Sequence, residues 1–201
     1  MTSSEPPRLR SDTLATRKLL QAAVLELVAE CGVDFQLADV AKRAGTSTAT
    51  AYRHFANRDA AIEIVIAERV DNLCRALVAV SQDLTGWAAL RAACDAWVRA
   101  IVPDAPAVAR LRSSAGLLER LHVGESAVTK LWDAISPILR ELIELELIPP
   151  RDVEFLFLCW NSLFDERNLL DLHETRHWPV ARIVESLTGT LIALLESETV
   201  A

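Results

Sequence analysis

The sequence predicts an all-α fold. Of its 201 residues, 51% are apolar, and the apolar side chains recur at helical spacing. Alternation of apolar and polar residues, which is typical of half-buried strands, is hard to find. Leu and Ala abound, whereas the chain has six Gly, eight Pro and one Tyr. A chain of this length can form one small and one medium domain, each with a buried core.

A first helix is predicted from about Thr13 to Cys31, because its apolar residues repeat on one side. The buried stripe of this helix is expected to hold Leu20, Val24, Leu27, Val28 and Cys31. Arg8 and Arg10 precede the helix in a segment predicted to be a flexible N-terminal arm. Such an arm can reach into a DNA minor groove, although an idle tail explains the two arginines equally well.

Two short helices joined by a three-residue turn are predicted next. Residues 38–44 form the first of them, with Val40 and Ala44 on one face. Gly45 suits the left-handed cap that ends such a helix, and Ser47 can accept the first amide hydrogens of the next one. This is the helix-turn-helix arrangement, whose second helix enters the DNA major groove.

The second of these helices has small and hydroxylated residues at its start and Tyr-Arg-His-Phe at its end. Ala51 and Phe55 are four residues apart and are expected to face the core. Phosphate contacts are expected from Gln36, Thr50, Tyr52, His54 and Arg58. Contacts to bases, or to the backbone beside them, are expected from Thr46, Thr48, Ala49 and Arg53, with Arg53 the best candidate for a guanine. Ser47 completes the predicted DNA-binding set.

A known sequence pattern covers this region. The matching residues are Arg17, Glu30, Gly32, Val40-Ala41-Lys42-Arg43-Ala44-Gly45, Ser47, Thr50, Tyr52, His54, Phe55 and Arg58. In this pattern residues 17–65 resemble the DNA-binding domain of TetR-type transcriptional regulators. Gln36, Ala49 and Ala61 depart from it, at positions where Thr, Gly and Leu are frequent. The remaining chain resembles the family only in being helical and of suitable length.

The resemblance implies a DNA-binding domain over residues 1–58 and a helical ligand-binding and dimerisation domain over residues 59–201. Proteins of this type are most often repressors that bind a palindromic operator as dimers and are released by a small molecule. Double-stranded DNA, a small, largely apolar effector and a second copy of the chain are therefore the expected partners. Neither a cofactor nor enzymatic activity is expected. A ligand-binding or interaction module with a vestigial DNA-binding head is the alternative.

The net charge of −7 hides a difference between the two parts of the chain. Residues 1–58 hold eight Lys and Arg against six Asp and Glu, a net charge of +2. The remainder holds 13 basic and 22 acidic residues, a net charge of −9. Because local charge positions a protein on a phosphate backbone, the acidic remainder is expected to face away from the duplex.

Targeting and redox signals point to the cytoplasm. No stretch of 18 uncharged apolar residues exists, and residues 1–7 are polar rather than a signal peptide. A soluble cytoplasmic protein without a membrane partner is therefore expected. The four cysteines are widely spaced in apolar helical contexts and are expected to be buried, reduced thiols.

Helices separated by short breaks are predicted over the rest of the chain. Their approximate ranges are 58–81, 87–102, 105–122, 125–147 with a bend at Pro137, 151–175, and a last helix ending near 196. The last two are rich in large apolar residues, and Ile183, Leu187, Leu191 and Leu195 repeat at intervals of four. This pattern favours a dimer interface, although a single domain can also absorb it.

Aromatic residues of the middle helices are candidate walls of an effector pocket, or else ordinary core residues. They are Trp97, Trp132, Trp160 and Phe164, with His122, Asn161 and Asp165 as candidate polar contacts. Asp165 belongs to a charged run, 165–167, that also reads as a surface patch or an interface salt bridge.

One motif points to a different class of protein. His173, Glu174 and His177 fit His-Glu-x-x-His, in which two imidazoles one helical turn apart bind zinc and the Glu is the general base. A zinc-dependent hydrolase is therefore a remote alternative. The context argues against it, because Trp178-Pro179 should end the helix at the second His and no further His follows.

Overall fold

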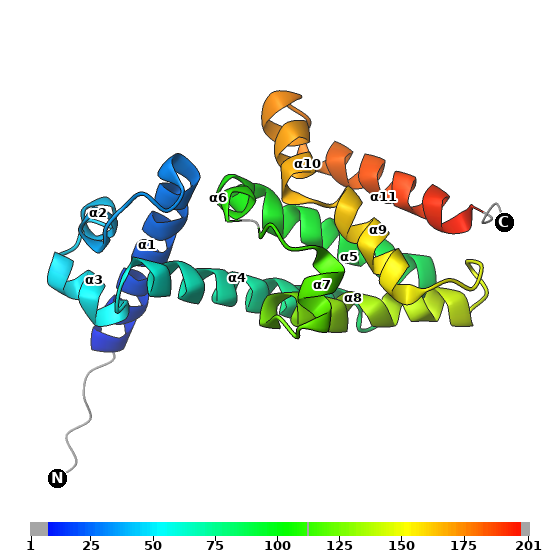
Figure 1. Ribbon diagram of the computed structural model, residues 1–201, viewed down its shortest axis with the longest axis horizontal. Helices are drawn as coiled ribbons and strands as arrows, with labels where there is room; N and C mark the ends of the chain where they lie inside the picture. Colours follow the sequence, from blue (N-terminus) through cyan, green and yellow to red (C-terminus); the bar gives the residue numbers. More distant parts are fainter. Residues whose placement is uncertain (1–7, 112, 198–201) are drawn as a thin grey trace, which may run out of the picture. The chain divides into compact units, whose positions relative to one another are not determined.

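The computed structural model describes residues 8–111 and 113–197, with side chains from residue 13 onward. Within these ranges the regular structure is helical and contains no strand, as Figure 1 shows, which confirms the all-α prediction. The chain divides into two compact units, Met1–Glu68 and Arg69–Ala201. The division falls inside helix α4 (Arg58–Ser81), so this one helix contributes residues to both units.

Three further helices build the N-terminal unit: α1 (Arg8–Cys31), α2 (Leu37–Arg43) and α3 (Thr48–His54). The stripe predicted on α1 is buried at Leu20, Val24, Leu27 and Val28, and Cys31 is half-buried. Glu68 near the middle of α4 receives hydrogen bonds from both Arg17 and Gln21 of α1. These polar bonds join α1 to the middle of α4.

The start of α1 differs from the prediction. The helix begins at Arg8, so Arg8 and Arg10 lie in its first turns and not in a flexible arm. No Gly or Pro stands between Arg8 and Cys31 to interrupt the helix, whereas Pro6 and Pro7 precede it directly. Residues 1–7 of the predicted arm, and the side chains of both arginines, lie outside the described residues.

The C-terminal unit holds the remaining helices. They are α5 (Gly86–Ile101), η1 (Val102–Asp104), α6 (Ala105–Arg110), α7 (Leu117–His122), α8 (Ser126–Glu144), α9 (Val153–Leu163), α10 (Glu166–Leu170), η2 (Asp171–Thr175) and α11 (Val180–Glu196). Helix α8 continues through Pro137, where the predicted bend stays a prediction. No helix in the described part of the chain is both long and apolar enough to cross a bilayer.

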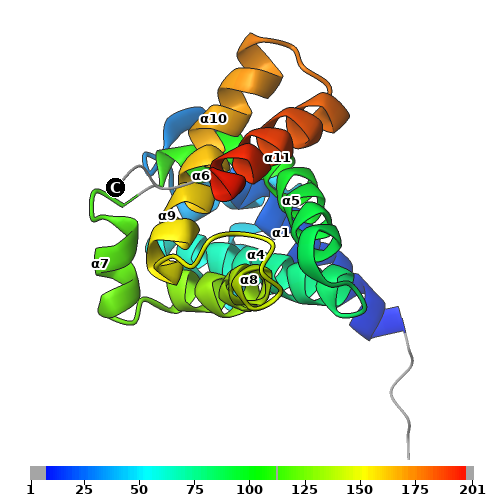
Figure 2. The same cartoon turned by 90° about the vertical axis from the view of Figure 1, so that its right-hand side faces the viewer.

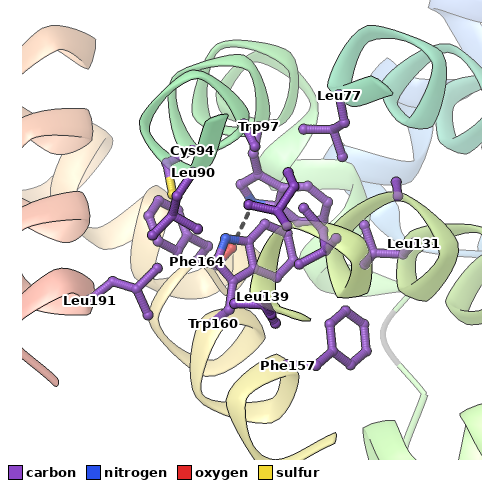
Figure 3. Close-up of a cluster of buried hydrophobic side chains, with 14 of the residues drawn as sticks. Leu77, Leu90, Cys94, Trp97, Leu131, Leu139, Phe157, Trp160, Phe164 and Leu191 are labelled. Carbon is purple, nitrogen blue, oxygen red and sulfur yellow. Dashed lines mark hydrogen bonds between the residues drawn. The ribbon is translucent and has the colours of Figure 1, made fainter. Parts of the chain in front are cut away.

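The core of this unit lies among α5, α8, α9 and α11, which pack beside one another (Figure 2). Its centre is aromatic. Trp160 of α9 packs edge-on against Trp97 of α5, with ring centroids 4.8 Å apart, and stacks on Phe164 at 5.7 Å. The indole nitrogen of Trp97 donates a hydrogen bond of 2.9 Å to the carbonyl oxygen of Phe164, shown as a dashed line in Figure 3. These contacts fix α5 against the end of α9.

The apolar stripe of α11 packs within the core of the C-terminal unit. Ile183, Leu191 and Leu195 are fully buried in the core of their own unit, and Leu187 is half-buried. The repeat of four residues therefore reports intramolecular packing, which is the single-domain explanation of the pattern. Phe155 of α9, by contrast, remains half exposed.

The predicted helix over residues 151–175 is in fact three elements. Helix α9 ends at Leu163, and Asp165 begins α10 by accepting a hydrogen bond from the backbone N–H of Arg167 at 2.9 Å. Asn168 donates back to the carbonyl oxygen of Ser162 at 2.7 Å. An Asp at a helix start satisfies an amide that the helix leaves unpaired. The charged run at 165–167 is thus a helix-capping signal within an apolar stretch.

Candidate nucleic-acid interface

The turn between α2 and α3 is built on Gly45. Its φ of +65° lies in the left-handed region, which residues with a Cβ rarely adopt. The backbone N–H of Thr46 donates to the carbonyl oxygen of Ala41 at 2.9 Å, and the backbone N–H of Gly45 donates to the carbonyl oxygen of Lys42 at 3.2 Å. This pair of bonds is the Schellman motif, which ends a helix and satisfies its last carbonyls. The turn predicted from Gly45 is confirmed.

Ser47 caps the start of α3, as its position predicted. Its Oγ accepts a hydrogen bond from the backbone N–H of Thr50 at 3.2 Å and lies 2.8 Å from the Thr50 hydroxyl. The guanidinium of Arg53 donates to the same Thr50 hydroxyl at 2.9 Å. A short polar chain of three side chains therefore runs along one edge of α3.

The two sides of α3 differ sharply in burial. Ala51 and Phe55 are 0% and 3% exposed and anchor the helix to the core of the N-terminal unit. Tyr52 is 58% exposed, and Thr48, Ala49 and Arg53 are exposed beside it. Thr46, Thr50 and His54 are half-buried at the edges. The face predicted to point outward does so, whereas the role of each residue at DNA stays a prediction.

Two predicted phosphate contacts lie away from α3. The Gln36 side chain is exposed and makes no cap bond, and its backbone N–H donates instead to the Asp39 carboxylate at 2.8 Å. The Arg58 guanidinium donates to the carbonyl oxygen of Val33 at 2.6 Å and to the Asp59 carboxylate at 2.8 Å. Arg58 therefore also secures the loop after α1 to the start of α4.

Arg43 has a structural partner that sequence reasoning missed. Its guanidinium forms two bonds with the Glu30 carboxylate, at 2.7 and 2.8 Å, and one with Glu26 at 3.1 Å. The hydrogen bond from Arg43 lowers the pKa of the Glu30 carboxyl below its ordinary value. Glu26 and Glu30 are four residues apart and share one face of α1, which is the signal that could have revealed the clamp. Arg43 thus holds α2 on α1.

The N-terminal unit matches a known family. Residues 19–63 fit the family model described as bacterial regulatory proteins of the tetR family. This segment is a TetR-type DNA-binding domain. The match covers the helix-turn-helix with its capped turn and both buried anchors of α3, so that the resemblance and the geometry concern the same residues. No curated protein matches the chain.

Solved structures share the fold over nearly the whole chain. The fatty acid degradation regulator FadR from Bacillus halodurans has a TM-score of 0.77 at 17% identity, covering 98% of this chain and all of the other. FadR from Bacillus subtilis, solved in complex with stearoyl-CoA, has a TM-score of 0.73 at 18% identity, with 88% and 97% covered. A tetR-family regulatory protein from Rhodococcus RHA1 has 0.71 at 16%, with 91% and 98% covered. At these identities the likeness shows the TetR-type fold.

The residues predicted to bind an effector separate into two groups. Trp97, Trp160 and Phe164 lie together in the buried aromatic cluster, and half-buried Trp132 joins it through Phe157 at 5.4 Å. The polar candidates are less buried than Trp97, Trp160 and Phe164. The exposed His122 ring is 3.0 Å from the Glu154 carboxylate, Asp165 caps α10, and Asn161 is half-buried on α9.

The His-Glu-x-x-His segment does not form a continuous helix. His173 and Glu174 lie in η2, which ends at Thr175, and His177 has a left-handed φ of +54° beyond it. The His173 Nδ1 is 3.1 Å from the carbonyl oxygen of Trp178. Among the described residues no three His, Cys, Asp or Glu side chains form a group that could hold a metal ion. The one-turn spacing on which the zinc alternative depends is therefore absent.

Gly45 provides a direct test of the turn geometry. Gly45→Ala is expected to lower the free energy of unfolding by about 1–2 kcal/mol, since an L-residue is strained at this φ. A Cβ added here meets no atom within 4 Å, so the backbone conformation is the whole cost. Gly45→Asn, the matched control, should lose less because Asn tolerates this region better. Thermal unfolding of the full chain measures both, and an unchanged Ala variant would contradict the assignment.

Proposed function

We propose that this chain is a dimeric, ligand-responsive transcriptional repressor that binds a palindromic operator and is released by a small, largely apolar effector. The observation that carries the proposal is the presentation of α3. Buried Ala51 and Phe55 hold the helix in place, while Thr48, Tyr52 and Arg53 extend from the opposite side. Small and hydrogen-bonding side chains suit close approach to base edges in a major groove.

The two classes of DNA contact follow from position on and around α3. Thr50, Tyr52, His54, Gln36 and Arg58 are proposed to bind phosphates, and Thr46, Thr48, Ala49 and Arg53 to lie against the bases. The Arg58 guanidinium already bonds to Val33 and Asp59. Because it carries five N–H donors, others remain for a phosphate. Thr50 and Ser47 are close enough to position the Arg53 guanidinium before it meets a base.

An apolar effector suits the chemistry of the C-terminal unit, whose buried side chains are aliphatic and aromatic. The Bacillus subtilis regulator was solved in complex with stearoyl-CoA, whose acyl chain is a long apolar segment, and this supports an effector with an apolar part. To release DNA, an effector must bind the DNA-free conformation more tightly than the DNA-bound one. The long helix α4 contributes residues to both units. It is therefore the element through which effector binding in one unit can change the other.

The proposed dimer uses the outward faces of α9 and α11. On α9, Phe155 is 51% exposed, and Leu158, Cys159 and Ser162 follow it at helical spacing. On α11 the corresponding residues are small: Ser186, Gly189, Thr190 and Ala193. A face of small side chains allows a second helix to approach closely, and interhelical distance depends on those side chains. A two-fold dimer would present two copies of α3 to one side of a duplex.

Selection from a random pool of duplex DNA tests the proposed function. The purified chain is expected to enrich a palindrome whose half-site centres are about 34 Å, one helical turn, apart or a multiple of it. Thr48→Glu is the matched control, because a carboxylate on the outward face of α3 repels phosphate and should abolish enrichment. Failure of the wild-type chain to enrich any site would mean that the DNA-binding head is vestigial.

Arg53 is expected to read one base. Arg53→Ala should weaken binding to the selected operator by about 1–3 kcal/mol and relax the preference at a single base pair. Tyr52→Phe should weaken all sequences alike, because a phosphate contact carries no sequence information. Fluorescence anisotropy on single-base operator variants separates these outcomes. Arg75→Ala, an exposed arginine in the C-terminal unit, should change neither, and unaltered selectivity after Arg53→Ala would refute the base contact.

Phe155 tests the dimer. Phe155→Lys should convert a dimer at micromolar concentration into a 22.1 kDa monomer, since a buried unpaired ammonium opposes association. Val123→Lys is the control, because Val123 is 76% exposed and lies outside α9 and α11. Sedimentation velocity distinguishes the two species. A wild-type chain that sediments as a monomer would exclude the dimer, and a Phe155→Lys chain that stays dimeric would move the interface elsewhere.

A further inference from the structure

Among the described side chains of the N-terminal unit, arginines are held by two different kinds of partner. The guanidinium groups of Arg17, Arg43 and Arg58 each pair with a carboxylate. The partner of Arg53 on α3 is instead the hydroxyl of Thr50, which accepts a hydrogen bond from the guanidinium at 2.9 Å. A neutral hydroxyl orients a guanidinium without neutralising its charge. Arg53 is therefore both oriented and fully charged on the exposed face of α3.

The hydroxyl of Thr50 is itself held in place. Thr50 is half-buried, and its β-branched side chain has few accessible rotamers on a helix. Its Oγ1 lies 2.8 Å from the Oγ of Ser47, which is fixed in turn by accepting the backbone N–H of Thr50 at 3.2 Å. Hydrogen bonds in such a chain polarise and strengthen one another. The acceptor that Arg53 meets is thus a fixed part of α3.

Other helix hydroxyls of this protein are used differently. Ser81, Ser162 and Thr190 each donate to the carbonyl oxygen four residues earlier, at 2.8, 2.7 and 2.8 Å. The Thr50 hydroxyl lies instead between two side chains. A hydroxyl has two lone pairs and one hydrogen, so Thr50 can accept from both neighbours and donate its own hydrogen to a phosphate. Orientation of the guanidinium is therefore compatible with the phosphate contact proposed for Thr50.

The bond turns the Arg53 side chain toward the start of α3. Thr50 precedes Arg53 by three residues, on the same face of the helix. In a helix-turn-helix domain the N-terminal residues of the second helix contact the base edges. A guanidinium held beside Thr50 lies at that level, whereas an unrestrained arginine in the last turn can extend to a phosphate. The N–H donors that remain can still match the O6 and N7 acceptors of a guanine.

We propose that Thr50 is the positioning residue that makes Arg53 a reader of one base pair. Ordering a free arginine side chain on binding costs conformational entropy, and a side chain that is already oriented loses less. Without the bond, Arg53 can contact a phosphate at any sequence, so the preference for one base falls. This inference rests on the proposed DNA-binding function and names the residue that sets its base specificity.

Thr50→Val tests the bond, because it keeps the branched shape and removes the hydroxyl. Fluorescence anisotropy compares the selected operator with its variants at the base pair that Arg53→Ala identifies. Thr50→Val is expected to weaken binding to all of them through the lost phosphate contact, and in addition to reduce the preference for the correct base by about fivefold. Thr50→Ser, the matched control, retains the hydroxyl and should keep the preference. Weakening of every sequence by the same factor would overturn the proposal.

A double variant separates positioning from a base contact made by Thr50 itself. In the Arg53→Ala chain, adding Thr50→Val should leave the residual base preference unchanged, since the hydroxyl then has no guanidinium to orient. A preference that falls by the same factor with and without Arg53 would mean that Thr50 acts on the base independently, and the proposal would be wrong.

Arg53→Lys provides a second test at an exposed position, where folding does not depend on the side chain. A lysine ammonium is a point donor and lacks the fork that holds the Thr50 hydroxyl and both guanine acceptors together. The variant should retain its affinity for unrelated duplexes and lose about as much base preference as Thr50→Val. Full preference in Arg53→Lys would contradict the proposal.

The DNA selection keeps the two possible failures apart. A wild-type chain that selects no palindrome removes the proposed function, and this inference with it. A selected palindrome together with full base preference in Thr50→Val removes only the role of Thr50 and leaves the DNA-binding function in place.

Discussion

Burial of Ala51 and Phe55 is the constraint on which the DNA-binding surface depends. Helix α3 has seven residues, too few to be stable in isolation, so it exists only because one side is fixed to a core. Once that side is fixed, the helical repeat places Tyr52 and Arg53 outside. The Schellman turn at Gly45 and the cap at Ser47 then set where the helix begins. Exposure of the recognition face is a consequence of packing on the other side.

The local parts of this arrangement were readable from the sequence. Gly45 and Ser47 act through backbone conformation and neighbouring amides, so the residue types alone predict the turn and the cap. The buried stripe of α1 and the anchors of α3 follow from helical periodicity. The clamp of Arg43 on Glu26 and Glu30 was missed, although the spacing of the two carboxylates indicates a common face. Which cation meets that face depends on how α2 packs on α1, and no local pattern encodes this.

The C-terminal unit shows the limit of the same reasoning. A stripe such as Ile183, Leu191 and Leu195 says that one face of a helix is buried, but not against which partner. Here the partner is the helix's own core, so the pattern says nothing about the dimer. The break at Asp165 was hidden for a similar reason, since large apolar residues on both sides made the segment read as one helix.

Helix α4 contributes residues to both units. Glu68 is bonded to Arg17 of α1, whereas its neighbour Arg69 is paired with Asp104 at 3.3 Å and belongs to the C-terminal unit. Two adjacent residues of one helix are therefore bonded to different units. A helix transmits displacement along its axis better than a loop does. Under the proposed function, an effector can release DNA only if the core that it rearranges holds the second half of α4 differently. The energy for release then comes from the difference in effector affinity between the two states.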